Sequence, residues 1–289
     1  MEIMISFAQA IIIGITQGIT ELFPISSLGH SVLLPGILGW NINQNADAFL
    51  TFLVATHFAT ALVLLALYRK DWWRIVKGIF RSLAEREIRE DDPDAKLGWL
   101  LVVSTIPAGI IGLLLKDSIV GFFLSPKSAA MFLIANGALL YVAERLRRRA
   151  KLSNGEEPDG DHRIAKELSW GQAAKVGLMQ VIALIPGFSR TGSTLAGSLL
   201  SGLSHEDALR YSFLLATPII GAAAALELPP LIATAGQHTL MVTLAGALSA
   251  GIAAYFSATF LAKYFETKTL TPFAIYCAAI GVISLVVFR

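Results

Sequence analysis

Residues 14–40 read GITQGITELFPISSLGHSVLLPGILGW, and this stretch decides how the fold of the whole chain is interpreted. The surrounding sequence is very apolar, yet Gln17, Glu21, Ser26, Ser27 and His30 occur within fourteen residues of this stretch. Ionisable groups at membrane depth are costly and rare, so they are candidates for function. Two short apolar arms flank a proline, and this pattern predicts a helical hairpin that enters a membrane and returns to the same side.

A second stretch, residues 177–203, repeats the first and reads GLMQVIALIPGFSRTGSTLAGSLLSGL. A shift of 163 positions aligns identical residues: Gly14 with Gly177, Gln17 with Gln180, Ile19 with Ile182, Ser26 with Ser189, Gly29 with Gly192 and Gly39 with Gly202. Where the first copy has Ser27, the second has Arg190. The chain therefore carries one motif twice, with an acid, Glu21, in one copy and a base, Arg190, in the other.

The composition indicates a polytopic membrane protein. Of the 289 residues, 55% are hydrophobic and 15% are charged, whereas a soluble domain carries about 25% charged residues. Long windows have no charge at all, and about 20 apolar residues suffice for a helix to span a bilayer. The net charge of +2 gives no reason to expect a nucleic-acid partner, and the single cysteine, Cys277, cannot form an internal disulfide.

The apolar windows predict six spans: residues 49–68, 97–115, 128–144, 211–228, 239–262 and 271–288, the fourth of which ends at Pro229-Pro230. The repeat continues beyond the hairpins, because residues 52–56, FLVAT, match residues 213–217, FLLAT. Each half is then one re-entrant hairpin followed by three spans. Since three is an odd number, the two halves must have opposite orientations in the membrane.

The predicted fold class is therefore an all-α integral membrane protein, with six transmembrane helices and two re-entrant helical hairpins in an inverted-topology repeat. We predict one membrane domain, residues 1–289. Its repeat halves are about residues 1–145 and 168–289, and a cytoplasmic loop, residues 146–167, joins them.

The positive charges predict the orientation. Four predicted loops on one face carry 18 of the 23 Lys and Arg residues: residues 69–96, 145–166, 205–210 and 263–268. Positive residues concentrate on the cytoplasmic side, so this face is expected to be cytoplasmic and both termini to lie outside. The first hairpin then enters from the outside and the second from the cytoplasm. Their tips are expected to meet near the midplane, in a site that is reached from the external face.

The spacing of the polar residues predicts which of them share a helix face. Gln17 and Glu21 are four residues apart, and Ser27 and His30 are three apart. By the same rule, Arg190 shares a face with Ser193 and Thr194, which follow it by three and four residues.

Ser26 and Ser189 fall at the starts of the two return helices, where free backbone N–H groups suit phosphate. The guanidinium of Arg190 adds a planar fork for phosphate oxygens. A hydroxyl, an imidazole, a carboxylate and an anion clamp together suit phosphoryl transfer. Nucleotide hydrolysis is not expected, because the sequence has no Walker-type glycine loop.

The segment QGITELFPISSLGH, residues 17–30, resembles the first signature of the undecaprenyl-pyrophosphate phosphatases of the bacitracin-resistance type. The segment PGFSRTGST, residues 186–194, is similar to their second signature, and the likeness also covers SFLLATP, residues 212–218, and TPFAIY, residues 271–276. The resemblance implies a hydrolase of the bacterial inner membrane. Such an enzyme removes the terminal phosphate of undecaprenyl pyrophosphate and recycles the lipid carrier for peptidoglycan synthesis.

The resemblance also implies roles for individual residues. Ser27 is the candidate nucleophile, with an activated water as the alternative, and His30 assists proton transfer. Glu21 is the essential acid, as a base or a metal ligand, and Arg190 binds the diphosphate. The remaining substrate-binding candidates are Gln17, Ser26, Ser189, Ser193 and Thr194. The resemblance further implies a homodimer embedded in membrane lipid.

One position departs from the commonest family pattern, in which the residue at Gln17 is an acid. With Glu21 as the one carboxylate, a two-carboxylate metal site is not expected. A divalent cation, Mg²⁺ or Ca²⁺, is instead expected to bind the diphosphate itself.

Plainer interpretations stand beside these. Glu21 and Arg190 could form a structural ion pair, and Ser26 and Ser189 are suited to helix capping. His30 could make a helix-packing hydrogen bond. His57 lies in a span with no evident partner in either motif, so packing is the favoured interpretation for it. For the whole chain the alternative is a transporter or a polyprenyl-phosphate flippase, since inverted repeats with midplane hairpins are typical of carriers.

Overall fold

The computed structural model describes residues 5–43, 47–122, 125–154 and 163–288, and within them all regular secondary structure is helical. The helices of the first half are α1 (Phe7–Thr20), α2 (Ser27–Ile37), α3 (Asp47–Leu67), α4 (Arg69–Glu85), α5 (Pro93–Phe122) and α6 (Pro126–Asn154). Those that follow are α7 (Arg163–Glu167), α8 (Trp170–Ile182), α9 (Arg190–Leu200), α10 (His205–Thr234), α11 (Gln237–Phe265) and α12 (Thr271–Val287).

Five of these helices are long and apolar enough to cross a membrane: Ala48–Leu67, Pro93–Leu115, Pro126–Arg149, His205–Thr234 and Gln237–Phe265. They confirm five of the six predicted spans. The sixth, 271–288, corresponds to α12, which is apolar but has 17 residues. That is slightly shorter than the about 20 residues that a span requires.

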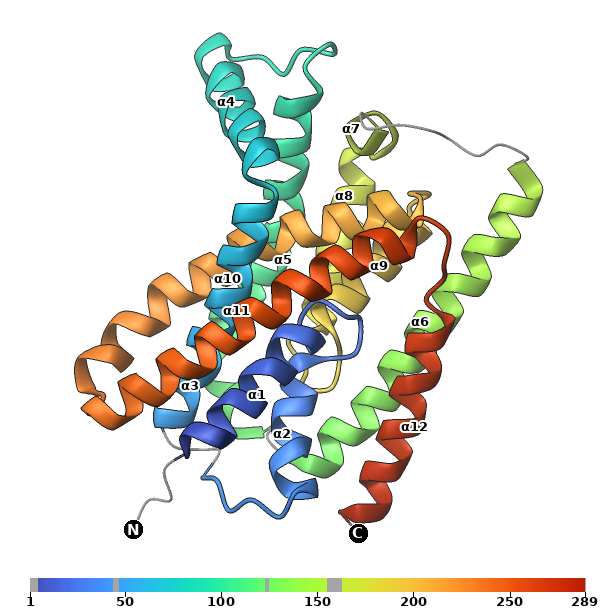
Figure 1. Ribbon diagram of the computed structural model, residues 1–289. Helices are drawn as coiled ribbons and strands as arrows, with labels where there is room; N and C mark the ends of the chain where they lie inside the picture. The colour runs from blue at the N-terminus through green and yellow to red at the C-terminus, as the bar shows by residue number, and fades with distance from the viewer. Residues whose placement is uncertain (1–4, 44–46, 123–124, 155–162, 289) are drawn as a thin grey trace.

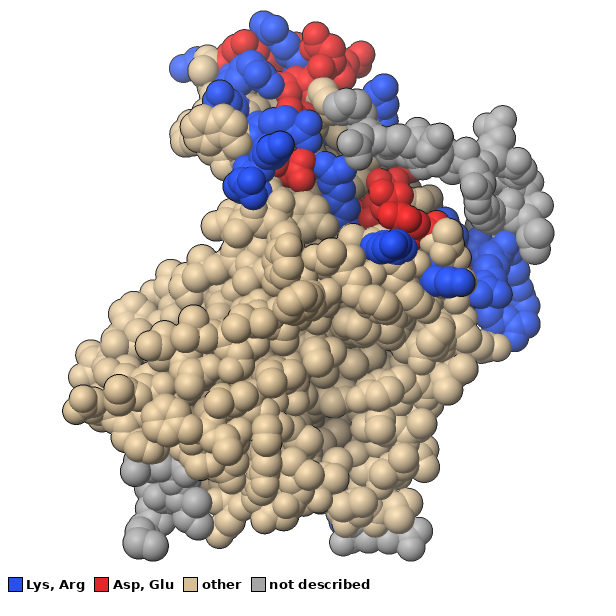
Figure 2. Space-filling model, viewed as in Figure 1, with Lys and Arg blue, Asp and Glu red and all other residues tan. Residues whose placement is uncertain are grey.

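The outer surface of the helical bundle is apolar in the way that a lipid-facing surface must be. On α11 the exposed residues Leu244, Leu248, Ile252 and Phe256 follow one another at every fourth position and are 59–66% exposed. Nearly all charged side chains on the face shown in Figure 2 gather at the end from which α4 projects. α1 begins and α12 ends at the opposite end of the molecule (Figure 1).

All four predicted loops of the charged face are wholly or partly helical, and the last, 263–268, begins inside α11, which ends at Phe265. In the other three the helical part is larger, so their assignment as loops was wrong. α4 fills much of the range 69–96, α6 extends to Asn154 within the range 145–166, and α10 already begins at His205. α4 is a helix because its apolar residues keep a helical spacing. Its buried face packs on α5, where the Trp99 indole N–H donates to Ser82 Oγ at 2.9 Å. Counting charges alone misses this pattern, because the charges occupy the other face of the helix.

The predicted end of the fourth span at Pro229-Pro230 was also wrong, since α10 continues through both prolines to Thr234. Each proline lacks an N–H group and therefore removes one hydrogen bond to the carbonyl four residues earlier. Because the backbone φ angle of proline suits a helix, the helix is not forced to end there. Near the end of the helix, Thr234 Oγ1 donates back to the carbonyls of Pro230 and Leu231 at 3.3 and 3.2 Å.

The first arm of each hairpin packs against a long helix from the other part of the chain. α1 lies along α11, and α8 lies along α5. Glycine allows each close approach: a Cβ atom at Gly14 would collide with the backbone of Gly246, and one at Gly177 would lie 2.6 Å from the Ser104 carbonyl oxygen. Gly14 and Gly177 are equivalent positions of the sequence repeat. These two contacts hold the turns of both hairpins in the middle of the bundle (Figure 1).

Candidate active site

The turn of the first hairpin presents a buried carboxylate. α1 ends at Thr20, and Glu21 is its C-cap residue, with 6% of its surface exposed. Gln17, one turn earlier, is fully buried, and its Nε2 donates to Glu21 Oε2 at 3.3 Å. The predicted shared face of these two residues is therefore present, and it points into the protein.

The return helix α2 brings a hydroxyl to the same carboxylate. Ser26 is its N-cap, and the Ser26 side chain accepts a hydrogen bond from the Gly29 amide at 3.2 Å. Its backbone φ of 69° is unusual for a residue with a side chain, and such strain persists only where the surroundings fix the conformation. The sharp turn places Ser27 at the first position of the helix, where its Oγ donates to Glu21 Oε2 at 2.6 Å.

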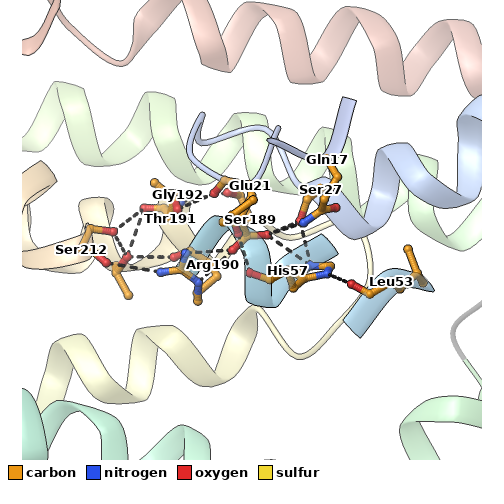
Figure 3. A network of polar contacts seen from close by, with 12 residues as sticks. Gln17, Glu21, Ser27, Leu53, His57, Ser189, Arg190, Thr191, Gly192 and Ser212 are labelled. Atoms are coloured by element: carbon orange, nitrogen blue, oxygen red, sulfur yellow. Dashed lines mark hydrogen bonds and ion pairs between the residues drawn. The ribbon is translucent and has the colours of Figure 1, made fainter. Parts of the chain in front are cut away.

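The second hairpin repeats this construction with an arginine. Ser189 is the N-cap of α9 and accepts from the Gly192 amide at 3.0 Å, so Arg190 is the first helical residue, as Ser27 is in α2. The Arg190 Nη2 and Nε donate to Glu21 Oε1 at 2.9 and 3.3 Å, and Nη1 donates to the Ser212 carbonyl at 3.3 Å. Acid and base from the two copies of the motif therefore form one ion pair (Figure 3).

Two buried side chains fasten the hairpin turns to each other. Asn136 of α6 donates from Nδ2 to the Pro24 carbonyl at 3.0 Å and accepts from the Ser189 amide at 3.1 Å. Thr191 Oγ1 donates to the Glu21 carbonyl at 2.8 Å. Because these bonds join backbone atoms of the two turns, they fix the distance between Glu21 and Arg190.

His57 completes the network, and its interpretation as a packing residue was wrong. This residue of α3 has its Nε2 3.3 Å from Glu21 Oε2 and 3.4 Å from Ser27 Oγ (Figure 3). The sequence offers little to identify it, since it lies in an apolar span outside both motifs. The one available signal is that a histidine at membrane depth is rare and is a functional candidate on that ground alone.

His30 lies apart from this network. Its Nδ1 donates to the Ser26 carbonyl at 2.7 Å, and its Nε2 pairs with the Tyr276 hydroxyl of α12 at 2.9 Å. The two rings are also stacked, with their centroids 5.7 Å apart. Both ring nitrogens are thus engaged away from the Ser27 hydroxyl, as the helix-packing alternative requires, and the role in proton transfer stays a prediction.

The two remaining candidates on α9 lie behind Arg190. Thr194 Oγ1 hydrogen-bonds the Ser212 hydroxyl and donates to the Arg190 carbonyl at 2.9 Å. Ser193 is fully buried, and its hydroxyl has no hydrogen-bond partner among the described residues. Their predicted contacts with substrate stay predictions.

The side chains of the site differ in how far they are exposed. Glu21 has 5% of its side chain exposed, whereas Arg190 has 14% and His57 has 24%. The guanidinium and the imidazole are therefore more accessible to a ligand than the carboxylate. The hydrogen bonds described for Arg190 use three of its five N–H donors, so the guanidinium retains capacity for an anion.

The donor set does not suit a divalent ion bound by the protein. No cluster of three or more His, Cys, Asp or Glu side chains with metal-ligand geometry occurs in the part of the chain that the structure describes. Glu21 is the one carboxylate of the network, and a guanidinium already occupies its Oε1. Hard cations such as Mg²⁺ and Ca²⁺ require several oxygen ligands, so the assignment of Glu21 as a metal ligand gains no support from its surroundings.

The fold and the site define an integral membrane protein in which two helix N-termini, a guanidinium and an acid–hydroxyl pair converge on one buried point. The family model described as Bacitracin resistance protein BacA matches residues 10–283, and the chain belongs to this family. It is 43% identical to an undecaprenyl-diphosphatase of Mycolicibacterium paratuberculosis, covering 99% of this chain and 98% of the relative. It is 41% identical to undecaprenyl-diphosphatase 2 of Frankia alni, over 98% of each chain. Identity to an undecaprenyl-diphosphatase of Acidiphilium cryptum is 43%, over 96% of each chain.

Proposed function

We propose that this protein is an undecaprenyl-diphosphatase, which hydrolyses the terminal phosphate of undecaprenyl pyrophosphate to give undecaprenyl phosphate for cell-wall synthesis. The observation that carries the proposal is the contact of Ser27 and Arg190 with the two oxygens of Glu21, at distances of 2.6 and 2.9 Å. This hydroxyl and this guanidinium are the first residues of two helices whose N-termini converge. The relatives that align over nearly their full length carry the same activity in their names.

The geometry supports a separate role for each of these groups in the phosphoryl transfer. Arg190 and the N-terminal amides of α2 and α9 attract the diphosphate, because helix N-termini and guanidinium groups both favour phosphate oxygens. Ser27 Oγ is the nucleophile, and Glu21 orients its hydroxyl through the 2.6 Å hydrogen bond. Charge stabilisation of this kind supplies most of the rate enhancement in phosphoryl transfer.

A divalent cation in this scheme travels with the substrate. Mg²⁺ or Ca²⁺ bound to the diphosphate oxygens neutralises part of their charge and needs few ligands from the protein. Gln17, which replaces the acid of the commonest pattern, donates to Glu21 rather than offering a second carboxylate. Phosphate release in the presence and absence of a chelator tests this dependence.

We further propose the complete inverted-repeat topology: six transmembrane helices and two re-entrant hairpins, with halves of about residues 1–145 and 168–289. The crosswise packing of α1 on α11 and of α8 on α5 supports it, because equivalent glycines make equivalent contacts in opposite halves. The clustering of charge at the end opposite the beginning of α1 supports a cytoplasmic location for that end (Figure 2). Both termini then lie outside, in the inner membrane, and substrate enters from the external face.

The orientation has a direct test. In intact cells, a membrane-impermeant thiol reagent is expected to label Asn43→Cys and to leave Gly155→Cys unlabelled. Cys277 is buried and can remain in the background. Labelling of residue 155 in place of residue 43 would reverse the proposed orientation.

The activity is tested with purified protein in detergent, as phosphate released from undecaprenyl or farnesyl pyrophosphate. Ser27→Ala, Glu21→Ala and Arg190→Ala are each expected to lower turnover by at least about 100-fold, in line with the loss of one essential group at a phosphoryl-transfer site. Ser201→Ala is the matched control, because among the described residues the hydroxyl of Ser201, the C-cap of α9, bonds only the Gly197 carbonyl of the same helix. Wild-type turnover in any of the three site variants would show that the site is wrongly assigned.

The transporter alternative gains no support from these contacts or from the names of the relatives. Movement of lipid across a sealed liposome without phosphate release would favour it. A homodimer rests on the family resemblance, and light scattering of the purified protein in detergent tests it.

A further inference from the structure

We propose that His57 is a further catalytic residue, which takes the proton from Ser27 Oγ when this oxygen attacks the terminal phosphorus. The inference rests on the proposed function, because it assigns a role within that reaction. It also shifts the proton-transfer role from the histidine inside the sequence motif, His30, to one that lies outside it.

The hydrogen bonds of the ring determine which nitrogen faces the nucleophile. His57 Nδ1 lies 2.7 Å from the Leu53 carbonyl, which can only accept, so Nδ1 carries a hydrogen. In the neutral ring Nε2 then carries the lone pair and can take up a proton beside Glu21 Oε2, 3.3 Å away. This nitrogen lies 3.4 Å from Ser27 Oγ (Figure 3). The distance is long for a hydrogen bond, as it often is before substrate binds and draws the reacting groups together.

Glu21 makes the transfer favourable from the other side. Its Oε2 lies 3.3 Å from His57 Nε2 and accepts the Ser27 hydroxyl at 2.6 Å. A proton that moves from Oγ to Nε2 therefore creates an imidazolium beside a carboxylate, and the two remain paired. The second charged group facing this point is Arg190, which is bound to the other oxygen of Glu21. It remains directed at the phosphate.

Neither alternative base can hold the proton as well. The Ser27 hydroxyl already donates to Glu21 Oε2, but a proton kept on that oxygen would neutralise the carboxylate that pairs with Arg190. Both nitrogens of His30 are engaged, with the Ser26 carbonyl and the Tyr276 hydroxyl. His57 also has 24% of its side chain exposed, more than Glu21 or Arg190, so its ring is accessible to a ligand.

The step balances with the groups present. Ser27 Oγ forms a bond to the terminal phosphorus, the anhydride P–O bond breaks, and the lipid monophosphate leaves with the electron pair while Nε2 holds the hydroxyl proton. Water then attacks the phosphoserine. Ser27 Oγ leaves with the proton that Nε2 returns, and the excess proton of the water leaves on the product phosphate. No oxidant, reductant or further reactant is required.

His57→Gln keeps a polar side chain of similar length but cannot accept a proton. We expect its kcat for farnesyl pyrophosphate to fall at least 100-fold, the usual contribution of a general base, while KM changes less than threefold. Added imidazole is expected to restore turnover of His57→Ala at least tenfold. His238→Gln, on an exposed helix start, is the matched control and should keep wild-type kcat.

A thermal melt of each variant separates catalysis from folding, and where His57→Gln melts early, His57→Asn takes its place. A kcat for the folded variant within tenfold of wild type, or a large loss that imidazole leaves unchanged, overturns the proposal. In both cases wild-type protein still releases phosphate, and the proposed function stands. If the wild-type protein releases none, the proposed function and this inference fail together.

Discussion

Removing both charges of the Glu21–Arg190 pair separates its catalytic role from a purely structural one. Arg190→Gln alone deletes the two guanidinium hydrogen bonds to Glu21, of 2.9 and 3.3 Å, and the one to the Ser212 carbonyl. It leaves a carboxylate that is 6% exposed without its cation. Breaking a buried ion pair from one side costs about 3–5 kcal/mol. His57, 3.3 Å from the carboxylate, can take up a proton and pair with it once the guanidinium is gone. We therefore expect a loss of unfolding free energy near the lower end of this range, about 3 kcal/mol.

Glu21→Gln combined with Arg190→Gln leaves two neutral amides in contact. We expect this double variant to recover most of the lost stability, since replacing a buried ion pair by neutral groups is often neutral or stabilising. Phosphate release should remain at least about 1,000-fold below wild type, because no guanidinium is left for the developing charge. Thermal melting and phosphate release in the same detergent measure both quantities. Turnover that returns together with stability, to within tenfold of wild type, would refute the catalytic role and leave a structural ion pair.

Three further predictions concern the support of the site and the stability of the fold. Asn136→Ala leaves the buried Ser189 amide without its partner and leaves the Pro24 carbonyl with only a weak hydrogen bond from Cys277 Sγ, at 3.8 Å. The free energy of unfolding should therefore fall by about 1–3 kcal/mol in denaturant titrations, and turnover should fall with it. Gly177→Val should lower the free energy of unfolding by about 2 kcal/mol or more in the same titration, because its side chain collides with the Ser104 backbone. Gly171→Val should not lower it, because a Cβ atom at Gly171 has no neighbouring atom within 4 Å among the described residues. Partial burial opposes ionisation of Asp92, but hydrogen bonds from the Ala95 amide and from a neighbouring arginine hold the pKa of Asp92 below its usual 3.8. Asp92 therefore stabilises the fold above pH 3.8 and loses this contribution as the pH falls through its lower folded value, so Asp92→Asn should weaken the decrease in melting temperature below pH 4. These expectations would be contradicted if Asp92→Asn lost melting temperature below pH 4 as steeply as the wild type. An Asn136→Ala protein with wild-type stability, or two glycine variants with the same free energy of unfolding, would also contradict them.

The convergence of the two hairpins could be predicted from the sequence because the motif occurs twice with a change of charge. A carboxylate in one copy and an arginine in the other, both at membrane depth, must each find a partner, and the nearest opposite charge is in the equivalent turn. The ion pair between Glu21 and Arg190 confirms that reasoning. The N-caps at Ser26 and Ser189 are equally visible in the sequence, since serine before an apolar helix is a common capping signal.

The place of His57 could not be predicted, because it depends on how α3 packs against α10 and α11 and not on any local pattern. The alignment of one helix against another is set by the shapes of many side chains, and a sequence motif contains no information about it. The contacts of His30 also depend on the tertiary structure. Its position three residues after Ser27 suggests contact, but the strained turn at Ser26 directs the Ser27 hydroxyl toward Glu21, while the imidazole of His30 faces Tyr276.

The helical part of the charged segments was missed for a different reason. In α4 the charged residues are numerous, but the residues that pack on α5 recur at helical spacing, and that spacing decides the secondary structure. In α10 the two prolines suggest an end, yet only one hydrogen bond per proline is lost and the apolar helix continues. Local breaker signals therefore carry less weight in a long apolar helix than in a soluble loop.

The central claim is that both hairpin turns hold one diphosphate. A structure determined with farnesyl methylenediphosphonate, an analogue that cannot be hydrolysed at the bridging position, tests this most directly. We predict its terminal phosphonate within hydrogen-bond distance of both Arg190 and the Ser27 hydroxyl, with the lipid chain leaving by the His57 side. An analogue bound elsewhere, with the contact between Glu21 and Arg190 undisturbed and no phosphonate beside either hairpin, would contradict the account.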